Sequence, residues 1–171
     1  MIITRKIATG NVGARQLLIQ GENMKKLILI AAVSAGMLLS AVSAQAADRT
    51  LMLPVAGALA VNDAQGRLGD SVRFYFGDQR TPKVLEKFGG EKTSQRTNAF
   101  GKSDEKACNW VFLSAMLHLQ QRAQDLGANA VVNIVSNYNN VEHASATEFE
   151  CHVGAIMAGV ALKGEFARIA K

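Results

Sequence analysis

Three kinds of apolar pattern divide this chain: an unbroken run near the N-terminus, a stretch with helical spacing, and several short stretches with strand-like spacing. The helical stretch follows Ser103, a residue type that favours helix N-caps, and Asp104 and Glu105 place negative charge on the first turn. Apolar residues then recur every three or four positions as far as Leu126, and Gly127 suits the left-handed residue that often follows a helix. We therefore predict a helix from Ser103 to Leu126.

The strand-like stretches either alternate between apolar and polar residues or are short and continuously apolar. The predicted strands are Leu51–Val61, Val72–Phe76, Ala128–Ser136, Thr147–Val153 and Ala155–Leu162, the last with a short helix as the alternative. In the fourth strand, alternation predicts two faces: Phe149, Cys151 and Val153 on one side, and Glu148, Glu150 and His152 on the other.

Polar stretches separate these elements. Asn62–Gly66 has the composition of a turn, Asn137–Asn140 that of a loop, and Lys163–Gly164 is expected to end the last strand. Gly77–Lys102 has few apolar residues and is predicted to be a long loop, with a single strand as the alternative. The resulting order is β-β-α-β-β-β, which predicts an α+β domain with one main helix packed on a mostly antiparallel sheet.

The unbroken apolar run belongs to a predicted signal peptide that begins at Met24. Lys25 and Lys26 form its positive start, and about 13 uncharged residues follow from Leu27, fewer than the roughly 18 to 20 of a membrane-spanning helix. Ala44 and Ala46 provide the small side chains that a signal peptidase requires. We therefore expect cleavage between Ala46 and Ala47 and a soluble periplasmic product.

Three segments follow from this interpretation. Residues 1–23 do not resemble the short start of a signal peptide and are interpreted as an upstream extension from a misplaced start codon. Residues 24–46 form the signal peptide, and residues 47–171 form a single domain. No cysteine lies near the cleavage site to accept a lipid, so we expect no membrane anchor after cleavage.

Removal of the first 46 residues changes the charge of the protein. The whole chain has a net charge of +5, which would suggest nucleic acid or an anionic membrane as a partner. The first 46 residues hold five of the 19 Lys and Arg and one of the 14 Asp and Glu, which leaves 14 basic and 13 acidic residues. The mature domain is therefore almost neutral, and we expect it to bind no nucleic acid.

Cys108 and Cys151 are the only cysteines of the chain. Cys108 lies in the first turn of the predicted helix, and Cys151 lies on the apolar face of a predicted strand. In an oxidising compartment two such cysteines should form a disulfide, with two buried free thiols as the alternative. A bridge that closes a loop of this length contributes about 4 kcal/mol in the loop-entropy description.

Candidate chemistry is sparse. His143, Glu148, Glu150 and His152 are weak candidates for a zinc or copper site, and the alternative is the solvated side of a sheet. Gly101-Lys102-Ser103 resembles the end of a phosphate-binding loop, but Arg96 replaces the glycine that such a loop requires, so no nucleotide is expected. No catalytic frame and no cofactor motif is found, and we predict that the protein is not an enzyme.

The segment QRAQDLGANAVV (residues 121–132), in which a helix ends in Gly-Ala-Asn-Ala-Val and continues into a strand, resembles the YbjQ/RcsF-type domain. The resemblance covers roughly Cys108 to Leu162. The segments TNAFGKSD (97–104) and ECHVGA (150–155) resemble a group of short exported bacterial proteins of unknown function, often labelled as an excinuclease ATPase subunit. This sequence does not support that label, since it has neither a nucleotide-binding loop nor zinc-finger cysteines.

The resemblance implies a small α+β domain. YbjQ-like proteins are described as heavy-metal binders that form ring-shaped oligomers, and RcsF is an outer-membrane lipoprotein that senses envelope stress. RcsF-like proteins carry a lipid-bearing cysteine and four further cysteines, whereas this chain has only Cys108 and Cys151. We therefore expect a non-catalytic periplasmic protein that binds an envelope protein or a second copy of itself, with metal binding as the alternative and an enzyme as the third hypothesis.

Overall fold

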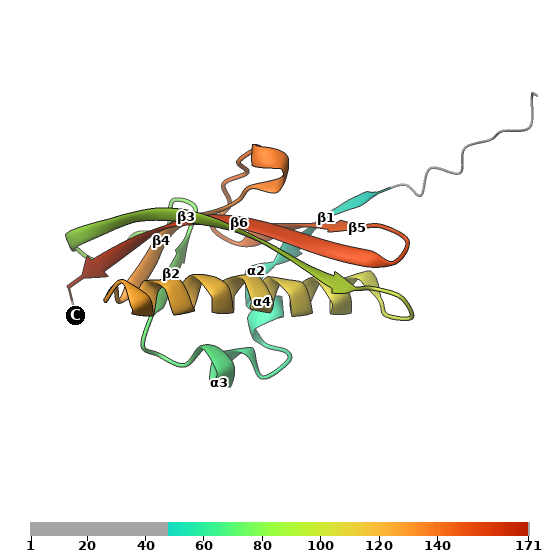
Figure 1. Cartoon of the computed structure of the whole chain (residues 1–171), viewed down its shortest axis with the longest axis horizontal. Helices are drawn as coiled ribbons and strands as arrows, with labels where there is room; N and C mark the ends of the chain where they lie inside the picture. The colour runs from blue at the N-terminus through green and yellow to red at the C-terminus, as the bar shows by residue number, and fades with distance from the viewer. Residues whose placement is uncertain (1–47, 171) are drawn as a thin grey trace, which may run out of the picture. The chain divides into compact units, whose positions relative to one another are not determined.

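The computed structural model describes residues 48–170, which form an α+β domain of six strands, three α-helices and a short 3-10 helix (Figure 1). The predicted fold class is confirmed. The upstream extension, the signal peptide and the cleavage site between Ala46 and Ala47 lie outside the described residues. The elements are β1 (Arg49–Pro54), α2 (Val55–Leu59), α3 (Ala64–Leu68), β2 (Arg73–Phe76), β3 (Val84–Asn98), α4 (Asp104–Asp125), β4 (Ala130–Ser136), η1 (Tyr138–Asn140), β5 (Glu148–Val153) and β6 (Met157–Ile169).

The long strand β6 organises the sheet. β3 pairs with one edge of β6 over almost its whole length, while β5 and β4 share the other edge, β5 at the start of β6 and β4 toward its end. β1 pairs with β5, and β2 pairs with β4 in the one parallel contact among the described strands. The sheet is therefore mixed but mostly antiparallel, as predicted.

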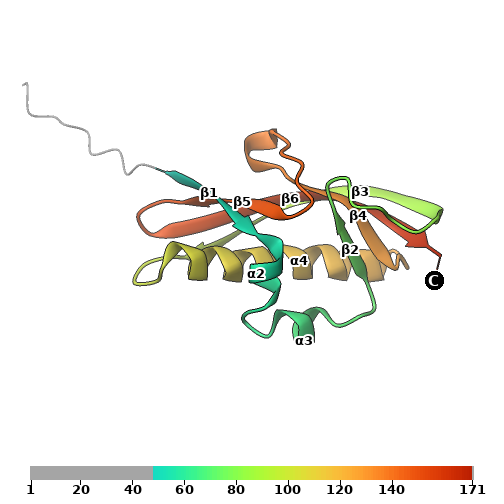
Figure 2. The same cartoon turned by 180° about the vertical axis from the view of Figure 1, so that it is seen from behind.

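Helix α4 lies across one face of this sheet, and α3 lies on the side of α4 that faces away from the sheet (Figures 1 and 2). The predicted ends of helix α4 are confirmed. The Ser103 hydroxyl accepts a hydrogen bond from the Lys106 N–H at 3.3 Å, and Gly127 after the helix has a left-handed φ of 71°. None of the helices in residues 48–170 is long and apolar enough to span a membrane.

The core lies between α4 and the sheet and contains a row of three aromatic rings. Phe112 of α4 stacks on Phe149 of β5 with ring centroids 4.1 Å apart, and its other neighbour is Phe76 of β2 at 6.0 Å. All three side chains are buried. The predicted apolar face of β5 is confirmed, because Phe149, Cys151 and Val153 are all buried.

The predicted disulfide is also confirmed. Cys108 in the first turns of α4 is bonded to Cys151 of β5, with the two Cα atoms 5.9 Å apart. Both residues are completely buried. The bridge therefore ties the main helix to a strand 43 residues later in the chain.

The predicted strand Leu51–Val61 was wrong in its second half. β1 ends at Pro54, and Val55–Leu59 forms helix α2 instead. A short apolar run has no periodicity that separates a strand from a buried helix, so Pro54 was the only local signal for the change. In the predicted turn, Asn62 and Asp63 do have left-handed φ values, but a second short helix, α3, starts at Ala64.

The long loop predicted over Gly77–Lys102 was wrong, and the alternative of one strand is what the structure contains. β3 spans 15 residues of this segment. Its polar composition hid it, because β3 is an edge strand with much of its surface in water. The last strand was also predicted too short, since β6 continues through Lys163 and Gly164 to Ile169.

The structure explains why position 164 in β6 is a glycine. A Cβ at this position would lie 2.6 Å from Cγ1 of Val131, which is fully buried. We expect Gly164→Ala to lower the free energy of unfolding by about 1–3 kcal/mol through overpacking. Urea unfolding measures the effect. Gly159→Ala on the same strand is the control, because its Cβ would meet no atom closer than 3.6 Å; equal stability of the two variants would contradict the explanation.

Candidate functional site

The sheet face opposite α4 carries the candidate site. Four strands place one residue each in a row across this face: Thr50 pairs with His152, His152 with Gly159, and Gly159 with Arg96. The loop that contains η1 rises above the same face (Figure 1) and contributes Tyr138. Strand register and one loop therefore bring together residues that lie up to about a hundred positions apart in the chain.

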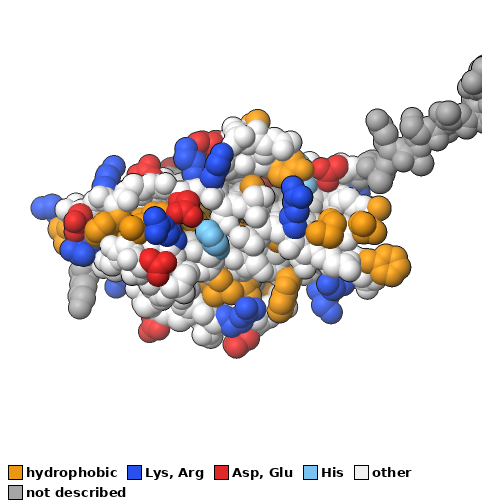
Figure 3. All heavy atoms as spheres, viewed as in Figure 1, with side chains coloured by type: hydrophobic (Ala, Val, Ile, Leu, Met, Phe, Trp, Pro, Cys, Tyr) orange, Lys and Arg blue, Asp and Glu red, His pale blue; other side chains and the backbone are white. Residues whose placement is uncertain are grey.

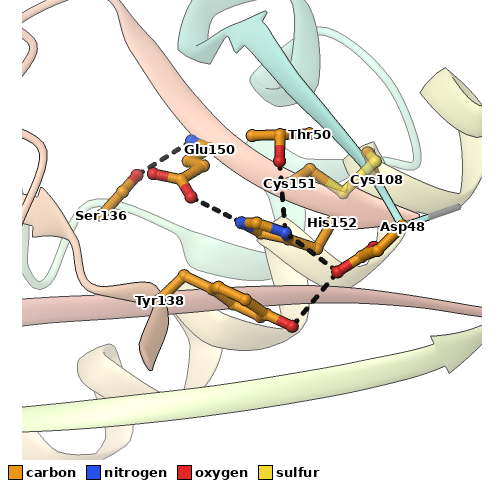
Figure 4. A network of polar contacts seen from close by, with 8 residues as sticks. All are labelled: Asp48, Thr50, Cys108, Ser136, Tyr138, Glu150, Cys151 and His152. Atoms are coloured by element: carbon orange, nitrogen blue, oxygen red, sulfur yellow. Dashed lines mark hydrogen bonds and ion pairs between the residues drawn. A yellow bond between two sulfur atoms is a disulfide. The ribbon is translucent and has the colours of Figure 1, made fainter. Parts of the chain in front are cut away.

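His152 is at the centre of a polar network (Figure 4). Its Nε2 lies 2.5 Å from a carboxylate oxygen of Glu150, and its Nδ1 lies 3.3 Å from a carboxylate oxygen of Asp48. The ring stacks on Tyr138 with centroids 3.4 Å apart, and the Tyr138 hydroxyl donates to Asp48 at 3.4 Å. Only 13% of the His152 side chain is exposed, so its position is fixed from three sides.

The loop above the sheet is anchored at its base. The backbone N–H of Asn137 donates to the carbonyl of Ala161 at 2.9 Å, and Ser136 and His143 exchange two backbone hydrogen bonds. The Ser136 hydroxyl accepts a hydrogen bond from the Glu150 N–H at 2.9 Å. The disulfide at Cys151 also fixes β5, the strand that carries His152. The backbone is therefore held in place on both sides of the stack, at His152 and at Tyr138.

A hydroxyl group also approaches the His152 ring. The nearest hydroxyl, that of Thr50, lies 3.4 Å from Nδ1 of His152, but the carboxylate of Asp48 faces the same nitrogen. Glu150 faces the other ring nitrogen. The two ring nitrogens of His152 therefore face one carboxylate each.

The sequence candidates for a metal site are only partly brought together. Glu150 and His152 are in contact, whereas His143 pairs with Ser136 in the exposed loop and Glu148 lies at the exposed start of β5. In residues 48–170 no three His, Cys, Asp or Glu side chains are placed to hold one metal ion. Zinc or copper binding stays a prediction from residue types.

Sequence reasoning missed Asp48, Thr50 and Tyr138 as members of this network. An aromatic ring inside the polar loop Asn137–Asn140 was the available signal for Tyr138. The sequence contains no local signal for Asp48 or Thr50, since their contacts with His152 span more than a hundred residues.

The Gly101-Lys102-Ser103 motif has a structural role. Lys102 donates through Nζ to the Asn98 carbonyl at 2.7 Å, and Ser103 caps α4, so the apparent phosphate-loop residues hold the β3–α4 connection. Trp110 of α4 lies at the surface with 45% of the residue exposed, and the guanidinium of Arg67 lies 5.4 Å from its ring centroid.

Two adjoining hollows lie on the open face around Tyr138 and Arg96. One, of about 250 Å³, extends past His152 over Gly159 to Met157. The other, of about 300 Å³, lies between β3 and the loop residues 137–140. Arg96 and Tyr138 line both hollows, and we call the two together the Tyr138 groove.

Exposed apolar side chains gather at the end of the domain where the β5–β6 turn meets the β3–α4 loop (Figure 3). Phe100, Ile156 and Met157 are 76%, 61% and 42% exposed. The backbone N–H of Ala99 donates to the Ile156 carbonyl at 2.9 Å, which joins the two loops. We call these three residues the apolar end.

The comparisons with known proteins leave the family open. No protein-family model matches the chain, and neither the curated proteins nor the solved structures contain a significant match. The likeness to the YbjQ/RcsF-type domain therefore stays a prediction from the sequence, and a function has to be argued from the surfaces described above.

Proposed function

We propose that this protein is exported to the periplasm and acts there as a non-catalytic binding protein that attaches to another protein of the cell envelope. The signal-peptide pattern before Ala47 and the buried disulfide both fit an oxidising compartment outside the cytoplasm. The apolar end is the single observation that carries the binding role.

Loop tips normally consist of Gly, Asn, Asp, Ser and Pro, because such residues satisfy turn geometry and face water without cost. Here the β5–β6 turn is Gly-Ala-Ile, followed by Met157 at the start of β6, and the neighbouring loop presents Phe100. Grouped exposure of large apolar side chains in a folded domain marks a contact surface, and Phe and Met are enriched in such contacts. The hydrogen bond between Ala99 and Ile156 holds the three side chains as one unit.

The occupant that fits best is a different protein with a concave surface. Phe100 and Ile156 lie at the tips of two loops, so the apolar end protrudes. A symmetric contact between two copies requires a self-complementary surface, and two protruding tips bury little area against each other.

The test is crosslinking of the protein in envelope fractions of its native bacterium. We expect the wild type to capture a defined envelope protein and Phe100→Ser/Ile156→Ser to lose most of that capture without a loss of stability. Leu85→Ser is the control, because Leu85 is an apolar residue at the other end of β3 whose exposure, 58%, is close to that of Ile156.

Three outcomes would overturn the proposal. Equal capture by the double variant would place the contact elsewhere, and equal loss with Leu85→Ser would show nonspecific adhesion. A dimer of the wild type in size-exclusion chromatography that the double variant abolishes would mean that a second copy, not another protein, covers the apolar end.

A further inference from the structure

We propose that the Tyr138 groove binds a small soluble ligand through an oxyanion, a phosphate or carboxylate group, which Arg96 and Lys92 contact. This site is separate in function from the apolar end and goes beyond the protein-binding role proposed above. The inference rests on the charges, the donors and the floor of the groove.

Two cations on the same face of β3 line the hollow beside the loop. Arg96 and Lys92 are four residues apart on the strand, and no carboxylate of residues 48–170 lies within 4 Å of either. Lys163, which pairs with Lys92 across the sheet, does have a carboxylate partner. Glu142 accepts a hydrogen bond from Lys163 and raises the pKa of Lys163 above its ordinary value. The charge of Lys163 is thus already matched, whereas those of Arg96 and Lys92 are not.

The rest of this hollow supplies hydrogen-bonding groups and no negative charge. Its lining residues are Lys92, Thr93, Ser94, Arg96, Asn137, Tyr138, Asn139, Asn140 and Ala161. Lys92 donates to the Asn140 side chain at 2.7 Å, which holds its ammonium group at the rim of the hollow. The guanidinium of Arg96 makes no side-chain hydrogen bond within residues 48–170 and keeps a fork of N–H donors for a planar or tetrahedral oxyanion.

Small residues keep the floor of the groove open. Gly159 and Ala161 of β6 face the groove. The backbone does not require glycine at 159, because a Cβ there would make only ordinary contacts, 3.6 Å to the Gln95 carbonyl oxygen and 3.8 Å to Cγ of Arg96. Glycine inside a central strand weakens the sheet, and it commonly marks a place where another group approaches the backbone closely.

Charge also orients the ligand within the groove. The hollow on the His152 side includes the carboxylate of Asp48, which repels an anion. The oxyanion therefore belongs on the Lys92 side, and an uncharged part of the ligand extends past Tyr138 toward His152 and Gly159. Hollows of about 300 and 250 Å³ have room for a ligand of the size of a phosphorylated or carboxylated monosaccharide.

The experiment is an NMR titration of the protein purified from cells that express the full chain. The probes are inorganic phosphate, glucose 6-phosphate and glucuronate, each at constant ionic strength, with chloride as the reference. We expect at least one of the three oxyanions to shift amide signals of residues 92–96 and 137–140 in a saturable manner. Saturation by phosphate alone, by the sugar phosphate or by the carboxylate then identifies the source of the oxyanion.

Matched variants test the assignment of the contacts. Arg96→Gln and Lys92→Gln should each weaken binding about tenfold, the loss of one charge-assisted contact. Lys83→Gln, which removes an exposed cation before β3, should bind as the wild type does. The inference is overturned if no probe gives saturable shifts at millimolar concentration, if Arg96→Gln and Lys92→Gln bind normally, or if Lys83→Gln weakens binding equally. The Phe100→Ser/Ile156→Ser variant should titrate like the wild type, so this proposal and the proposed function fail separately.

Discussion

Replacement of both cysteines in a Cys108→Ala/Cys151→Ala variant is expected to lower the free energy of unfolding by about 4 kcal/mol. The disulfide closes a loop between residues 43 positions apart, so its loss gives the unfolded chain many more conformations. A domain of this size has a total stability of only about 5–15 kcal/mol, so the loss removes a large share of the stability of the fold. Urea unfolding of the oxidised wild type and the variant measures the difference.

Reduction provides the control for this prediction. Under dithiothreitol the wild type should become as unstable as the variant, and the variant itself should not respond. An equal stability of oxidised and reduced wild type would show that the bridge does not constrain the unfolded chain. A response of the variant to the reductant would show that the reagent acts through something other than Cys108 and Cys151.

Phe112→Ala is expected to lower the free energy of unfolding by about 3–5 kcal/mol. Phe112 is fully buried and stands between Phe76 and Phe149, so its truncation leaves a cavity where helix α4 meets two strands. Phe100→Ala is the matched control, because the same atoms are removed from an exposed ring and the change should stay within about 0.5 kcal/mol. Similar losses in the two variants, measured by urea unfolding, would contradict this description of the core.

The parts of the fold that the sequence predicted are those with local causes. The cap at Ser103, the spacing of the apolar residues and Gly127 all lie within α4, and they placed the helix to within a residue or two. The disulfide followed from the count of two cysteines on facing elements. The faces of β5 followed from alternation alone, since Phe149, Cys151 and Val153 are buried as expected.

The parts that were missed depend on contacts between distant residues. β3 is a strand because β6 pairs with it, and its own residues are mostly polar. The candidate site has the same origin. Alternation placed Glu150 and His152 on one face, but the positions of Asp48, Tyr138 and Arg96 follow from strand register and from the fold of a loop. No local pattern in the sequence contains that information.

The most direct test of export and oxidation is the intact mass of the protein isolated from its native cells without reductant, before and after treatment with an alkylating reagent in denaturant. We predict a chain that begins at Ala47 and carries a disulfide between Cys108 and Cys151, so that alkylation leaves its mass unchanged. A chain that begins at Met1, or a product in which both sulfurs are alkylated without prior reduction, would contradict both predictions and place the protein in the cytoplasm.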